Sequence, residues 1–142
     1  RFSVVTMWKH WFHLYEKTIG DLGIQGHVAS IRSIDVAPDN QALLAGKEED
    51  IFPLLSAEAE AAIAEDGAEV ILLGSTTMHQ AHQFLSARLD VPVINPGPLT
   101  YKLVEAILGL GLSHSRAAYP DSPVPRTEMI AAMMAAAGTF DH

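Results

Sequence analysis

Val70-Ile-Leu-Leu-Gly-Ser-Thr-Thr-Met78 is the most informative stretch of this chain. Its first four residues are apolar on both faces, which is typical of a central parallel strand that helices cover on each side. Gly74 permits a tight turn, and a helical pattern begins at Met78. Such a turn directs hydroxyls and backbone N–H groups at one spot, where the helix dipole favours an anion. We therefore predict a small-ligand site here.

The sequence on either side of this turn alternates between strand and helix patterns. We predict strands over residues 2–7, 27–34, 70–73 and 91–94, and helices over residues 8–20, 52–66, 78–89 and 99–110. The first helix ends at Gly20 or Gly23, and residues 35–49 form a loop that can hold one helical turn. Strand-helix units in series imply parallel strands with right-handed crossovers. The expected fold is a three-layer α/β/α lobe with a four-stranded parallel sheet over residues 1–112.

The C-terminal residues 113–142 are predicted to leave this lobe as a linker and a final helix. The composition shifts to Ser, His, Arg and Pro between Gly111 and Pro125, which indicates extended chain. Residues 127–137 then form an Ala-rich and Met-rich helix with an apolar stripe and no strand after it. We expect this stripe to pack on a missing or partner lobe.

Composition excludes several classes of function. A net charge of −8 and a pI near 5.2 argue against nucleic-acid binding, which depends on clustered Lys and Arg. The absence of a long apolar run and of a charged leader predicts no membrane partner and a cytoplasmic location. Zero cysteines exclude disulfides and thiol catalysis by this chain. A start at Arg1 suggests a piece of a longer protein, or a processed terminus.

Ligands of open parallel sheets bind beyond the carboxyl ends of the strands. The residues that follow the predicted strands are Thr6, Met7, Trp8, Asp35, Ser75, Thr76, Thr77 and Asn95. Most of these side chains donate hydrogen bonds and only Asp35 is charged, which suits a small carboxylate or a cyclic imide. Helix capping is an equally good interpretation of Ser75, Thr76 or Thr77 taken singly.

The histidines do not form a metal-binding pattern. His10 with His13 and His79 with His82 are i, i+3 pairs, but no third ligand accompanies either pair in sequence. Surface or half-buried histidines are favoured, and we predict no metal and no cofactor. His79 could act on the Ser75 hydroxyl only if its ring points back toward the turn. The serine-hydrolase elbow, the dinucleotide fingerprint and the phosphate loop are absent from the sequence.

Several motifs, in order, resemble the aspartate/glutamate/hydantoin racemase superfamily, and most closely its hydantoin and allantoin racemase branch. The resemblance covers about residues 2–120, the second lobe of that fold, and it is carried by residues 2–6, 29–35, 67–78, 91–96 and 103–119. It implies two facing α/β lobes, each with one cysteine after a strand. One thiolate removes the α-proton and the other thiol protonates the opposite face.

Ser75 stands at the position that resembles the second of these cysteines. A serine hydroxyl is a far weaker acid than a thiol of pKa about 8.5, so it cannot exchange a proton with a carbon acid at neutral pH. The resemblance assigns binding of a carboxylate or ring carbonyl to Thr6 and Thr76. Trp8 either covers the substrate or packs under its helix, and Gly74, Thr77 and Asn95 complete the predicted substrate site.

We therefore expect one lobe of a cofactor-independent, racemase-type isomerase that binds a hydantoin, allantoin or amino-acid-like carbon acid. With Ser75 the lobe is expected to be inactive or altered in chemistry. Two alternatives stay open: a relative that acts as a decarboxylase or a cis-trans isomerase, and a non-catalytic module that binds small carboxylates. The expected partner is the missing first lobe or a second copy of the chain.

Overall fold

The computed structural model describes residues 1–39, 47–75 and 78–137. Within it the chain divides into two compact units, Arg1–Val104 and Glu105–His142. The first unit contains all the strands of the described residues, and the second contains the end of helix α5 and all of helix α6.

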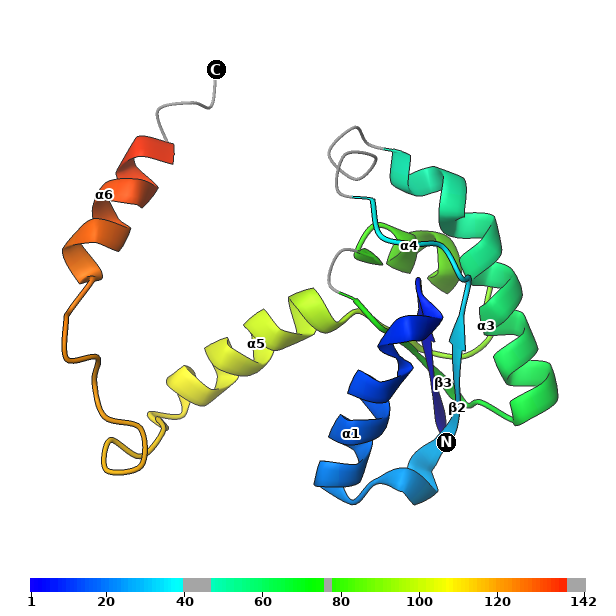
Figure 1. Ribbon diagram of the computed structural model, residues 1–142, viewed down its shortest axis with the longest axis horizontal. Helices are drawn as coiled ribbons and strands as arrows, with labels where there is room; N and C mark the ends of the chain where they lie inside the picture. Colours follow the sequence, from blue (N-terminus) through cyan, green and yellow to red (C-terminus); the bar gives the residue numbers. More distant parts are fainter. Residues whose placement is uncertain (40–46, 76–77, 138–142) are drawn as a thin grey trace. The chain divides into compact units, whose positions relative to one another are not determined.

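A four-stranded, all-parallel sheet forms the centre of the first unit (Figure 1). Its strands are β1 (Phe2–Thr6), β2 (Val28–Ser33), β3 (Val70–Leu73) and β4 (Val93–Ile94), in the spatial order β2-β1-β3-β4. Every neighbouring pair is parallel, so all the strands end at the same edge. The predicted α/β fold with a parallel sheet is confirmed.

Helices cover the two faces of the sheet unequally. The core lies between the sheet and helices α3 (Phe52–Asp66) and α4 (Ala81–Ser86), and the side chains of Val5 and Ile71 point into it. Because side chains alternate along a strand, Val4 and Thr6 lie on the opposite face. That face carries α1 (Phe12–Leu22), which gives the predicted three layers (Figure 1).

Two helices end at glycines in the left-handed conformation. Gly23 has φ 67° and closes α1, and Gly67 has φ 71° and closes α3. Of the two predicted ends of the first helix, the structure selects Gly23. Its predicted start at residue 8 is wrong, because a 3₁₀ turn, η1 (Lys9–Trp11), precedes α1. Two more short 3₁₀ turns, η2 (Gln25–His27) and η3 (Lys47–Ile51), lie before β2 and before α3.

Three other elements differ from the prediction by two residues or more at one end. The helix expected over residues 78–89 is only α4 (Ala81–Ser86), since the residues before it form turns with bonds from Met78 N–H to Ser75 O and from His82 N–H to His79 O. The strand expected over residues 91–94 is only β4. Helix α5 (Pro96–Gly109) begins three residues early, because proline is well suited to a first helical turn.

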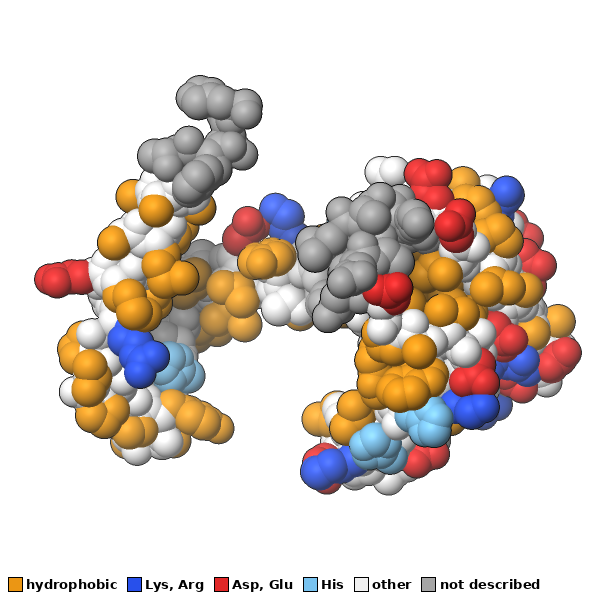
Figure 2. Space-filling model, turned by 45° about the horizontal axis from the view of Figure 1, so that its top comes forward, with side chains coloured by type: hydrophobic (Ala, Val, Ile, Leu, Met, Phe, Trp, Pro, Cys, Tyr) orange, Lys and Arg blue, Asp and Glu red, His pale blue; other side chains and the backbone are white. Residues whose placement is uncertain are grey.

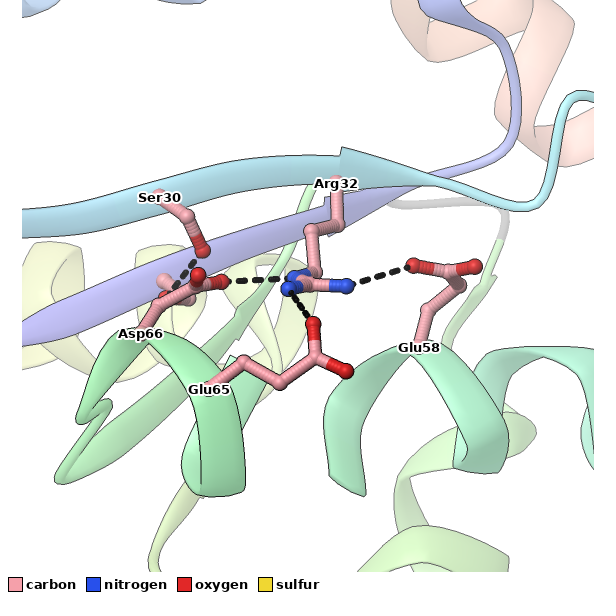
Figure 3. A network of polar contacts seen from close by, with 6 residues as sticks. Ser30, Arg32, Glu58, Glu65 and Asp66 are labelled. Carbon is pink, nitrogen blue, oxygen red and sulfur yellow. Dashed lines mark hydrogen bonds and ion pairs between the residues drawn. The ribbon is translucent and has the colours of Figure 1, made fainter. Parts of the chain in front are cut away.

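An ionic network fixes the edge strand β2 to α3 (Figure 3). The guanidinium of Arg32 donates to Asp66 Oδ2 and to Glu65 Oε2, at 2.6 Å in each case, and lies 3.5 Å from Glu58 Oε2. Hydrogen bonds from Arg32 and from Ser30 hold the pKa of Asp66 below its usual range. The pKa of Arg32 is correspondingly raised by Asp66 and Glu65. The network therefore links the sheet to its covering layer by charge as well as by apolar contact.

The C-terminal helices have no buried residue. Neither α5 nor α6 (Thr127–Ala137) contains one among the described residues, although both carry apolar side chains. Met134 of α6 is 71% exposed and Leu108 of α5 is 66% exposed. Hydrophobic side chains are accordingly visible on the outside of the C-terminal part of the chain (Figure 2). Among the described residues, no helix is both long enough and apolar enough to span a bilayer.

Candidate functional site

The carboxyl edge of the sheet brings together residues that are far apart in sequence. Gly74 directly follows β3 and its N–H donates to Val5 O at 2.8 Å, which places it beside Thr6 at the end of β1. Ser75 comes next in the chain. Asn95 follows β4, whose Ile94 pairs with Leu72 of β3. Three neighbouring strands therefore deliver Thr6, Gly74, Ser75 and Asn95 to one edge, as their places in the sequence predict.

Thr6 is buried, and its hydroxyl has a partner on α1. Its Oγ1 lies 2.9 Å from the Tyr15 hydroxyl, and the residue is 0% exposed. The Tyr15 hydroxyl also donates to the carbonyl oxygen of Gly74. One phenol thus joins the ends of β1 and β3 from the helix that packs over them. The predicted role of Thr6 in binding a ligand stays a prediction.

Gly74 is required by close packing. A Cβ placed on it would lie 2.7 Å from Tyr15 Oη and 2.8 Å from Thr6 Cβ, closer than real side chains approach. Any larger residue would therefore displace Tyr15 or the end of β1. The glycine predicted for a tight turn is also needed for the approach of α1.

Asn95 leaves one hydrogen-bonding atom unused. Its Nδ2 donates to His79 O at 3.2 Å, while its Oδ1 is buried and has no partner among the described residues. A buried amide oxygen without a donor is costly, so this atom is suited to accept a hydrogen bond from a ligand or a water molecule. Among the described side chains, the Oδ1 atom of Asn95 is therefore a buried acceptor that a ligand could use.

A cavity of about 620 Å³ adjoins Asn95. Its lining contains His79, Gln80, His82, Gln83 and Asn95, together with the aromatic rings of Phe52 and Phe84, Glu49 and Pro98. The ring of His82 is held by a hydrogen bond between Nε2 and Val93 O at 3.1 Å. The volume is within the range of small-molecule sites, and Asn95 is the predicted site residue among the described residues that line it. No group of three or more His, Cys, Asp or Glu suited to a metal ion occurs among the described residues.

A second recess, of about 470 Å³, lies on the face of the sheet that carries α1, away from the core. It is lined by Phe2, Ile24, Val70, Leu72 and Ile94, with Arg1 and His27. Most of these groups are apolar, and few polar groups converge that could orient a ligand. We therefore place the candidate site at the carboxyl edge.

Trp8 lies at the mouth of the first βα connection. It is half-buried, and its ring centroid lies 4.5 Å from that of His10 and 6.2 Å from that of Trp11. Beside it, Lys9 Nζ and Asp35 Oδ2 form an exposed ion pair at 2.6 Å. Lys9 thus balances the charge of Asp35, the charged residue among those that follow the predicted strands. Whether Trp8 covers a ligand stays a prediction.

Two of the predicted residues, Thr76 and Thr77, lie outside the described residues. Tyr15 is the residue that sequence reasoning missed, because its place among Trp8, Trp11, Phe12 and Ile19 reads as helix packing. One signal could have found it. A tyrosine in the first helix after a strand carries a hydroxyl that needs a partner once its ring is buried.

The fold is an open parallel α/β lobe, and its candidate site lies beyond the carboxyl ends of the strands. The model of the Asp/Glu/hydantoin racemase family matches residues 1–104. A hydantoin racemase from Rhizobium meliloti is 36% identical over 125 residues, which cover 84% of this chain and 50% of that protein. The chain therefore belongs to the Asp/Glu/hydantoin racemase family.

Solved structures agree with this assignment. Allantoin racemase from Klebsiella pneumoniae matches with a TM-score of 0.72 at 30% identity, over 82% of this chain and 46% of that one. Allantoin racemase from Pseudomonas fluorescens matches with a TM-score of 0.71 at 30% identity, over 87% and 52%. The chain thus spans about half the length of the relatives it matches.

Proposed function

We propose that this chain is one lobe of a racemase-type isomerase that binds a small carbon acid, such as a hydantoin, an allantoin or an amino-acid-like carboxylate. The ligand would lie at the carboxyl edge, with Ser75 at the reacting position. The proposed binding residues are Thr6, Trp8, Gly74, Thr76, Thr77 and Asn95. The names of the relatives support the substrate class, and the convergence of three strand ends supports the place.

The position of Ser75 supports the proposed place of the site, and its hydroxyl restricts the chemistry that can occur there. It follows β3 where the family resemblance implies a catalytic cysteine, and the chain has no cysteine. A serine hydroxyl can donate a hydrogen bond to a ligand. Its pKa is far above the thiol value of about 8.5, so it cannot supply or remove the α-proton as a thiol does. We infer that the lobe binds its ligand and lacks thiol-based turnover.

The decisive experiment is Ser75→Cys in the complete protein. Allantoin or a 5-substituted hydantoin in D₂O would be followed by NMR for deuterium at the chiral carbon and by circular dichroism for loss of optical activity. A gain of exchange would support a racemase scaffold that serine has silenced. Ser86→Cys adds a thiol on the exposed end of α4 and serves as the matched control.

A non-catalytic binding module is the second candidate function, and the lack of cysteine favours it. In that case the wild-type protein binds hydantoins or short carboxylates, and Ser75→Cys gives no exchange. Calorimetric titration of the unmodified protein measures the binding. Failure of both the titration and the exchange assay would contradict both candidates.

We further propose that the exposed apolar side chains of α5 and the apolar stripe of α6 contact a second lobe or a second copy of the chain. On α6 the stripe consists of Met129, Ile130, Met133 and Met134, which are all at least half exposed. The relatives are about twice as long as the part of them that this chain matches. A second lobe is therefore the partner that the family resemblance favours.

A further inference from the structure

The Tyr15 hydroxyl is the one polar group of α1 that reaches the carboxyl edge in the contacts of the described residues. It lies between Thr6 Oγ1, at 2.9 Å, and the carbonyl oxygen of Gly74. These two residues end β1 and follow β3, and Gly74 immediately precedes Ser75. The phenol therefore meets the backbone one residue from the proposed reacting position.

The donors in these two hydrogen bonds follow from the number of protons that each group carries. A carbonyl oxygen only accepts, and a phenol has one proton, so Tyr15 O–H donates to Gly74 O. If that proton pointed at Thr6 instead, the phenol and carbonyl oxygens would face each other with no proton between them. The hydrogen bond between Thr6 and Tyr15 must then be donated by Thr6. Thr6 Oγ1 has no proton left for a carboxylate or a ring carbonyl.

The fixed carbonyl also orients Ser75. The peptide unit that joins Gly74 to Ser75 is planar and trans, so its N–H points opposite to its C=O. Because Tyr15 holds the C=O, the N–H of Ser75 points away from α1. The packing of Gly74 strengthens this constraint, since no room for a Cβ exists between the turn, Tyr15 and Thr6.

We propose that Tyr15 is a positioning residue for the site at Ser75, and that Thr6 serves the site through Tyr15 and not by contact with the ligand. This inference rests on the proposed function, and it divides the proposed residues into two groups. Thr6, Gly74 and Tyr15 fix the turn. Ser75, Trp8 and Asn95 are left to meet the ligand.

The first test needs no ligand. Tyr15→Phe keeps the ring and removes the hydroxyl, and amide hydrogen exchange in the complete protein is compared at Gly74, Met78 and Ile71. We expect exchange at Gly74 and Met78 to be about tenfold faster, with Ile71 of β3 unchanged. Unchanged exchange at the turn, or equal acceleration at Ile71, would overturn the positioning role. Tyr119→Phe, at an exposed tyrosine of the second unit, is the matched control.

The second test is a double-mutant cycle on the affinity for allantoin. Tyr15→Phe and Thr6→Val should each weaken binding about tenfold, and the double variant should be no weaker than either, because both remove the same linkage. Thr6→Ser, which keeps the hydroxyl, should restore the wild-type affinity. A double variant weaker by the product of the two single effects would mean that Thr6 contacts the ligand directly, and would overturn the assignment.

The two tests separate this inference from the proposed function. If the wild-type protein does not bind allantoin or a hydantoin, the proposed function fails, and the exchange measurement alone decides the role of Tyr15. If allantoin binds while Tyr15→Phe alters neither exchange nor affinity, the proposed function stands and Tyr15 has no positioning role.

Discussion

The carboxyl edge of the sheet and the C-terminal helices use their side chains in opposite ways. At the edge Thr6 is fully buried, and its hydroxyl and the Gly74 carbonyl are both bound to Tyr15. In α5 and α6, by contrast, no described residue is buried and the apolar side chains face outward. Internal contacts therefore bury the polar groups of Thr6 and Gly74 in the first region, whereas the second exposes apolar surface.

We expect the two regions to affect different properties: the core should determine the stability of the fold, and α5 and α6 should determine association with a partner. The strands and α3 close a core within the first unit, so changes there should act on unfolding. The exposed apolar side chains of α5 and α6 are not part of that core, so changes there should act on assembly. The predictions below test this separation.

The largest expected effect is on the core. Leu55 of α3 is 0% exposed, and Leu55→Ala should lower the free energy of unfolding by about 2 to 5 kcal/mol. Leu108→Ala on α5, at a side chain that is 66% exposed, should change it by less than about 0.5 kcal/mol. Urea unfolding of the free 142-residue chain measures both. Equal costs would show that α5 belongs to the core and would remove the contrast.

A smaller effect is expected at the edge. Gly74→Ala forces a Cβ to within 2.7 Å of Tyr15 Oη, and overpacking of this kind costs about 1 to 3 kcal/mol. Gly109→Ala is the matched change on α5, where a Cβ meets nothing within 4 Å, and should alter stability by less than about 0.5 kcal/mol. Thermal unfolding compares the two. A harmless Gly74→Ala would contradict the close packing of Tyr15.

The Arg32 network predicts a loss of stability in acid. The pKa of Asp66 is lowered in the folded protein, mainly by Arg32, from an unfolded value of about 3.9. Its contribution is therefore complete above about pH 4 and is lost as the pH falls through the folded pKa. Arg32→Met should destabilise the protein at pH 7 and reduce this acid dependence, as measured by urea unfolding at several pH values.

Lys17→Met provides the control for that comparison. Lys17 pairs with Asp21 on the surface of α1, and exposed pairs of this kind are worth about 0.3 to 0.5 kcal/mol. Its removal should leave the acid dependence almost unchanged. A flat difference between the wild type and Arg32→Met over the acid range would mean that Asp66 titrates normally.

The smallest effect on unfolding is expected on α6. Met133→Glu should change the stability of the free chain by less than about 0.5 kcal/mol, because Met133 is 64% exposed. It should nevertheless weaken association of the complete protein, since it places a charge in the stripe. Ala135→Glu on the opposite side of the helix should not do so. Light scattering decides, and identical behaviour of the two variants would argue against an interface on this stripe.

Local pattern was sufficient for much of the fold. The bounds of α3, β3 and α6 were predicted as the structure has them, because apolar runs and glycine caps act over a few residues. Helix α4 was predicted too long. The amide of Asn95 binds the carbonyl of His79, and this contact between residues 16 positions apart accompanies turns where a helix was expected.

Contacts between residues distant in sequence were likewise not predicted at the site. The parallel direction of the strands was predicted from the strand-helix pattern, and it places Thr6, Gly74 and Asn95 at one edge. The hydrogen bond from Tyr15 to Gly74 joins residues 59 positions apart, so no periodicity in the helix reveals it. The Thr6 hydroxyl is assigned as a donor to Tyr15 because of that bond, so its role could not be predicted from the sequence either.

The brevity of β4 has a consequence for how copies of this protein can meet. An open sheet exposes backbone groups at its margins, where a strand from another molecule can add and start a fibril. Here one margin is only Val93–Ile94, and the preceding Pro92 has no N–H to offer. Too few groups remain for a stable foreign ladder. Strand addition at this margin of the described sheet is therefore disfavoured.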